Sequence, residues 1–139
     1  MLCSEMQDIG REFASSPERR DSALLKAYRR LEMTARQRSG AVEHGDLWGG
    51  IFGKQAKLRW PSLPEDKTRA RMQLFQGAVG AFRNLRGHKE GVEEGFASNE
   101  LILLDLLSRL LAAAEQPHHP MCSETHRNER DGADVGETE

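Results

Sequence analysis

The sequence lacks the features that would place it in a membrane or cross-link it. Its 139 residues contain two cysteines, Cys3 and Cys122, which lie near opposite ends and match no metal-binding spacing. The most apolar run, residues 101–114, is too short to span a bilayer and is interrupted by three polar residues. No signal peptide precedes the first helical pattern. These absences predict a soluble, reduced, cytoplasmic protein with no membrane partner.

The sequence also lacks a large excess of either charge, since its formal net charge is −2. The acidic and basic residues are nevertheless unevenly distributed along the chain. Residues 1–114 hold 18 Lys and Arg against 15 Asp and Glu, whereas residues 115–139 hold seven acids and two arginines. The larger part of the chain is therefore mildly basic. Such a balance permits a partner with a phosphate backbone but does not demand one.

The last residues have almost no apolar side chains and are rich in proline, histidine and charge. This composition predicts a disordered acidic tail over residues 116–139. His118, His119, Cys122 and His126 lie within it and have the chemistry of metal ligands. Structural zinc needs a closed framework of four ligands, which a solvated tail does not offer, so we predict no metal and no cofactor.

Alternating strand patterns are absent from the whole sequence, which predicts an all-α fold. Apolar residues at helical spacing predict a short leading helix in residues 1–14, then a helical domain over residues 15–115. Within that domain we expect a bundle of three long helices plus one or two short ones. The expected helices are residues 17–39, 47–52 (capped by Asp46), 65–86 and 100–115 (capped by Ser98 or Asn99). Residues 54–64 form a loop because they contain Trp-Pro and Leu-Pro pairs.

Residues 49–54 are only superficially similar to a phosphate-binding loop. Their glycine spacing is too short, Gln55 stands where a magnesium-binding Ser or Thr belongs, and no strand precedes them. We therefore do not predict a nucleotide-binding loop here.

The helix that organises the rest of the chain begins near Glu65 and contains MQLFQGAVGAFRNLRGH. Its apolar residues Met72, Phe75, Val79 and Phe82 recur at intervals of three and four, so they share one face. Gly77 and Gly80 interrupt the helix, and each costs about 1 kcal/mol relative to alanine. Two such residues predict that another backbone approaches closely. Gly87 predicts the end of the helix.

A polar cluster closes this helix: Arg83, Asn84, Arg86 and His88. Cations and asparagine are common at helix ends, so the cluster has a purely structural interpretation. The functional interpretation is RNA cleavage without metal, in which His88 transfers protons, Arg83 stabilises phosphate charge and Asn84 positions the phosphate. The absence of an obvious carboxylate cluster for magnesium agrees with this route. In an unbroken helix Arg83 and His88 lie about 140° apart, so they share a site only if the chain turns at Gly87 or a second subunit contributes.

The same residues carry a resemblance to known proteins. Arg83-Asn84-x-x-x-His88 resembles the Arg-x4-6-His motif of the HEPN superfamily, small helical proteins that include many RNases of toxin–antitoxin, abortive-infection and CRISPR-associated systems. The ordered segments LLKAYRRLE, GDLWGGIFGK, LFQGAVGAFRNLRGH and the leucine-rich closing helix resemble the phage and bacterial Ymh family over roughly residues 20–112. That family usually reads Arg-Asn-Pro-Arg-Ala-His, whereas this chain has Leu85 and Gly87.

The resemblance implies a HEPN-like bundle that forms a homodimer through the motif helices, with a shared RNA-cleaving cleft. It implies Arg83, Asn84 and His88 as catalytic residues, and we expect Arg86 and Lys89 to bind the RNA substrate. The implied role is phage defence or toxin-like growth arrest, with an antitoxin as a candidate partner. Some HEPN toxins have a tyrosine two residues after the histidine as the antitoxin's target; here Glu90 occupies that place. The alternative is a non-catalytic module that binds RNA or protein.

Overall fold

The structure is a computed structural model that describes residues 1–40, 45–88 and 94–117, without the side chains of His88 and Glu94. The predicted all-α bundle is confirmed. A π-helical segment, Val79–Arg83, joins α4 to α5 without a break, so the two form one rod. The helices are α1 (Gln7–Ser15), α2 (Arg20–Ser39), α3 (Leu47–Phe52), α4 (Glu65–Ala78), α5 (Asn84–His88) and α6 (Ala97–Ala113).

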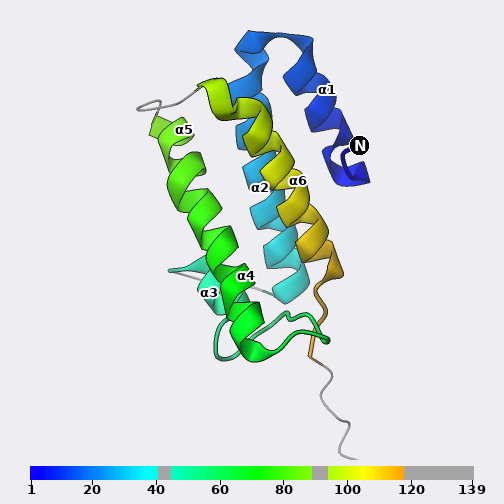
Figure 1. The fold of residues 1–139 in the computed structure, drawn as a ribbon, viewed down its shortest axis with the longest axis vertical. Coiled ribbons are helices and arrows are strands. Elements are labelled where there is room, and N and C mark those ends of the chain that lie inside the picture. Colours follow the sequence, from blue (N-terminus) through cyan, green and yellow to red (C-terminus); the bar gives the residue numbers. More distant parts are fainter. Residues whose placement is uncertain (41–44, 89–93, 118–139) are drawn as a thin grey trace, which may run out of the picture.

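The three long elements α2, α6 and the α4–α5 rod run side by side along the long axis of the molecule (Figure 1). Helix α1 packs against α2, and α3 packs against α4. The loop after α3 and the end of the described chain lie at the opposite end of the bundle from α5 (Figure 1). None of the helices in the described ranges has both the length and the apolar character needed to cross a bilayer.

The core forms where α2 and α6 face each other. Leu24 and Tyr28 of α2 and Leu104 and Leu107 of α6 are fully buried. These positions recur every three or four residues, so the face expected for residues 17–39 is the one that packs. Full burial of a leucine side chain contributes about 1.5–3 kcal/mol, which makes this face the main support of the bundle.

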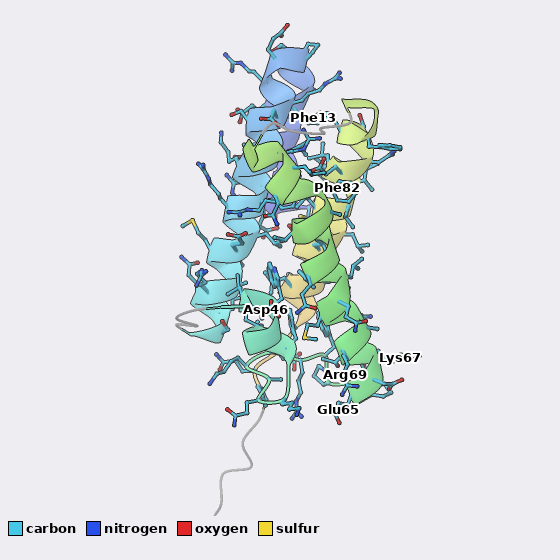
Figure 2. The ribbon with its side chains drawn as sticks, turned by 90° about the vertical axis from the view of Figure 1, so that its left-hand side faces the viewer. Phe13, Asp46, Glu65, Lys67, Arg69 and Phe82 are labelled. Atoms are coloured by element: carbon cyan, nitrogen blue, oxygen red, sulfur yellow. The ribbon has the colours of Figure 1, made fainter. Side chains whose placement is uncertain are left out.

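The short leading helix is confirmed as α1, and it belongs to the same core as the rest of the bundle. Met6 and Ile9 are buried, and Phe13 near the end of α1 packs beside α2 (Figure 2). On the outer side of α1, both terminal nitrogens of Arg30 donate to the Asp8 carboxylate at 2.7 and 2.9 Å. These hydrogen bonds lower the pKa of Asp8 to about 2. Residues 1–14 are therefore part of the bundle.

Four aromatic rings fix α3 against α4 and the following loop. The ring centroids of Trp48 and Phe75 are 4.7 Å apart, and those of Phe52 and Trp60 are 4.8 Å apart. Asp46 precedes α3 but makes no capping hydrogen bond, contrary to the prediction. Its carboxylate instead accepts a hydrogen bond from the side chain of Gln76 on α4. Asp46 therefore links the start of α3 to α4 and does not cap α3 (Figure 2).

The end of α6 is held by residues from distant parts of the chain. The Arg38 guanidinium donates to the carbonyl oxygens of Leu111 and Ala114 at the end of α6. The Leu111 carbonyl also accepts from the Ala114 N–H at 3.2 Å. The Trp60 indole Nε1 donates to the Leu110 carbonyl at 2.8 Å. Beyond the helix, the backbones of Arg59 and Glu115 form an isolated antiparallel bridge. The loop predicted for residues 54–64 is therefore anchored at both α6 and α4.

Candidate functional site

The candidate site begins in the π-helical segment of the central rod. The Asn84 N–H donates to the Val79 carbonyl, five residues back, so this turn contains one residue more than an α-turn. Such single π-turns within α-helices occur frequently at functional sites. The extra residue changes the rotation of everything that follows, and it lies immediately before the polar cluster.

The helix does not end at Gly87, contrary to the prediction. Helix α5 continues through Gly87 to His88, because a glycine adopts helical dihedral angles as readily as the ones that end a helix. Arg83 and His88 therefore lie about 140° apart around one helix. A turn at Gly87 does not bring them together. The remaining arrangement that unites them in one site is a contribution from a second subunit.

Arg83 extends from the rod toward α2. Its Nε atom lies 3.2 Å from a carboxylate oxygen of Glu32, and 38% of the Arg83 side chain is exposed. Phe82, the preceding residue, is half-buried beside the core, and Asn84 is exposed (Figure 2). The ion pair orients the guanidinium through Nε, while the side chain still reaches solvent. Arg83 and Asn84 are thus accessible to a ligand.

Arg86 lies three residues further along the rod, in the interior between α2 and α6. Its side chain is 3% exposed. Its Nε donates to both carboxylate oxygens of Glu100 at 2.9 and 2.7 Å, and its terminal Nη1 donates to Asp21 at 3.1 Å. The Tyr28 hydroxyl donates to the same Glu100 at 2.7 Å. We call Asp21, Tyr28, Arg86 and Glu100 the buried network.

The protonation states within the buried network follow from these contacts. Burial alone would lower the pKa of Arg86, but the hydrogen bonds to Glu100 and Asp21 outweigh that effect and raise it. Burial, together with the hydrogen bond to Glu100, raises the pKa of Tyr28. The guanidinium is therefore fixed as a cation and the phenol as a neutral donor. The expected role of Arg86 in substrate binding is corrected to a structural one, because its guanidinium is enclosed and engaged by two carboxylates.

Two other expected site residues fall outside what is described. Lys89 and the side chain of His88 lie there, as do the candidate metal ligands of the tail. Among the described residues, no three His, Cys, Asp or Glu side chains are grouped to hold a metal ion.

Sequence reasoning missed the acidic partners of the two arginines. Asp21 lies seven residues before the buried Tyr28 and Glu32 lies four after it, so both acids are near the packed face of α2. Glu100 sits one turn before Leu104 on the buried face of α6 and is itself 3% exposed. An acid at a core position is a signal in its own right, because a buried carboxylate requires a partner.

Exposed glycines on the rod lead to a prediction about assembly. Gly77 and Gly80 are exposed, and a Cβ atom placed on either meets no atom of the described chain within 4 Å. No backbone of the described chain makes the expected close approach, so a second copy would have to supply it. We expect Gly80→Ala to leave folding intact or raise the free energy of unfolding by up to about 1 kcal/mol. Gly80→Leu should weaken the dimer, with overpacking costing about 1–3 kcal/mol.

Sedimentation velocity together with thermal unfolding checks this expectation. Gly80→Leu should increase the monomer fraction, whereas Gly80→Ala, which adds one methyl group, should change it much less. Identical dimer fractions for Gly80→Leu and wild type would contradict close packing at this face.

The fold and site together define a class: a small all-α bundle whose central rod carries a partly exposed arginine and an exposed asparagine where a π-helical segment ends. A family model described as a protein of unknown function, Hypoth_ymh, matches residues 6–111. The chain belongs to this family. No curated protein and no solved structure matches it.

Proposed function

We propose that this protein is a metal-independent endoribonuclease of the HEPN type, active as a homodimer in phage defence or toxin-like growth arrest. The observation that carries the proposal is the uninterrupted helix through Gly87. It holds a partly exposed arginine and a histidine about 140° apart around one rod, a geometry that suits a site completed by a second copy. The RNLRGH segment of this chain supports the same view through its resemblance to the Arg-x4-6-His motif.

Each residue has a role in the proposed reaction. The imidazole of His88 removes the proton from the 2′-hydroxyl or returns one to the leaving 5′-oxygen, since its ordinary pKa lies near neutrality. The guanidinium of Arg83 stabilises the charge that develops on the phosphate oxygens. Glu32, 3.2 Å from Arg83 Nε, holds that guanidinium in position. Asn84 donates from its amide to the same phosphate.

Substitution of the two charged residues tests the proposal. We expect His88→Ala and Arg83→Ala each to reduce cleavage of single-stranded RNA by about 100- to 10,000-fold, with EDTA leaving the wild-type rate unchanged. RNA integrity on denaturing gels and growth of expressing cells are the measurements. Arg109→Ala, which removes an exposed arginine of α6, is the control and should cleave like wild type. Equal RNA cleavage and equal growth for all four proteins would rule out catalysis by Arg83 and His88. The alternative, a non-catalytic module that binds RNA or protein, would then remain.

A further inference from the structure

A second candidate site lies at the end of the molecule far from α5. It is a hollow of about 520 Å³ lined by Ser39, Lys54, Gln55, Ala56, Lys57, Arg59, Gln116 and Pro117. We call it the basic hollow. It lies between the end of α2, the loop after α3 and the segment after α6, which meet at this end (Figure 1).

Among the residues that the structure describes, the lining of the basic hollow has three cations and no carboxylate. Lys54, Lys57 and Arg59 are exposed, and none of them forms an ion pair with a carboxylate in the described part of the chain. Glu115 pairs with Arg59 through backbone hydrogen bonds of 2.9 and 2.8 Å, but it does not line the hollow. Three unneutralised cations around one concave surface create a potential that attracts an anion.

The walls of the hollow are fixed by the fold. The Lys57 and Leu58 amides both donate to the Ile51 carbonyl, and Leu58 is fully buried. On the facing side, the Gln116 side chain donates to the Arg38 carbonyl at 3.1 Å. The cations therefore project from a backbone that is held on both sides, so little ordering is required when a ligand binds.

The chemistry of the lining selects the kind of anion. Ammonium, guanidinium and amide groups supply donors suited to phosphate oxygens and sugar hydroxyls. The Ser39 hydroxyl donates to the Ala35 carbonyl at 2.6 Å and remains an acceptor. The volume falls in the range of organic ligands and exceeds what a single inorganic ion needs. No aromatic side chain lines the hollow, so a base has no stacking surface there.

We propose that the basic hollow binds the sugar–phosphate backbone of an RNA strand, without reading its bases, and so holds the substrate at a point remote from Arg83 and His88. This proposal rests on the proposed ribonuclease function. The rod from residue 65 to residue 88 is about 36 Å long, so the hollow is an anchor and takes no part in cleavage. It makes the enzyme favour long strands over short ones.

The test compares two pairs of charge-removing substitutions in the inactive His88→Ala protein, so that the RNA stays intact. Lys54→Gln with Lys57→Gln alters the hollow. Lys67→Gln with Arg69→Gln removes the same charge from two exposed residues at the start of α4 (Figure 2). Lys67 lies 3.8 Å from Asp66, and Arg69 lies 3.8 Å from Glu65. We expect the first pair to weaken binding of a long single-stranded RNA about tenfold in fluorescence anisotropy, and the second less than about twofold.

Salt dependence distinguishes reduced phosphate neutralisation from general weakening. The slope of log affinity against log salt should be shallower by about 0.7 for each phosphate that the hollow pair no longer neutralises. Equal affinities and slopes for the two pairs would overturn the proposal. A mononucleotide that displaces RNA at micromolar concentration would assign the hollow to a small phosphate ligand instead. Polyglutamate that competes as well as RNA would assign it to an acidic polypeptide.

The outcome is distinguishable from failure of the nuclease proposal. If wild type does not cleave RNA but the hollow pair binds it more weakly than the control pair, the hollow stands and the nuclease function falls. If wild type cleaves RNA and the two pairs of variants bind it equally, the nuclease function stands and the proposed role of the hollow falls.

Discussion

Mixing purified Arg83→Ala and His88→Ala proteins should restore RNA cleavage that each has lost alone. In a twofold dimer whose sites combine Arg83 of one copy with His88 of the other, a mixed dimer contains one intact site and one doubly altered site. Half of the dimers are mixed after random exchange, so about a quarter of the wild-type activity should return. The physical reason is the separation of about 140° between Arg83 and His88 around the unbroken rod, which keeps them apart within one copy.

The measurement is the initial rate of RNA cleavage after denaturant-assisted subunit exchange, as a function of mixing ratio. The rate should peak at equal amounts of the two variants. A protein carrying both substitutions, mixed with His88→Ala, is the matched control and should restore nothing, since no site then contains an intact pair. Absence of recovery, with mixed dimers confirmed by mass spectrometry, would show that each copy completes its own site.

Removing the cation of the buried network should destabilise the bundle by about 3–5 kcal/mol. Arg86→Met retains much of the side-chain volume but leaves Glu100, itself 3% exposed, without its positive partner. An uncompensated carboxylate in the interior carries its full desolvation cost. The measurement is the free energy of unfolding from urea titration monitored by circular dichroism.

Two comparisons make this prediction specific. Arg69→Met removes an exposed arginine 3.8 Å from Glu65 and should cost less than about 1 kcal/mol. The triple change Tyr28→Phe, Arg86→Met and Glu100→Leu removes the three fully buried polar side chains of the network together. It should recover most of the stability, because the remaining member, Asp21, is 34% exposed and no buried polar group is left unpaired. A single Arg86→Met as stable as wild type would mean that Arg86 has no structural role.

The helical framework follows closely from local patterns in the sequence. Spacing indicates which face of α2 packs, because the residues that pack are also those that recur every three or four positions. The breaks also follow, since Trp60-Pro61 and Leu63-Pro64 prevent a helix between α3 and α4. The helix end at Gly87 was predicted wrongly. A glycine permits termination but does not impose it.

The arrangement of the site depends on contacts that no local pattern contains. Arg83 and Arg86 look equivalent in the sequence, yet one is partly exposed and the other is enclosed. Glu32 and Glu100 make the difference, and both are distant in the chain. The π-turn is equally hidden, because it depends on how the rod fits the core. The basic hollow joins residues 39, 54–59 and 116–117, which only the folded bundle brings together.

The placement of the aromatic residues gives the protein two built-in optical reporters. Both tryptophans, Trp48 and Trp60, sit in the ring cluster at the α3 end, whereas the chain's one tyrosine, Tyr28, is hydrogen-bonded in the buried network. Tryptophan emission therefore follows melting near the basic hollow. Near-ultraviolet absorbance of the tyrosine follows melting around Arg86. Coincident curves would establish that the bundle unfolds in one cooperative step, and separated curves would reveal which half opens first.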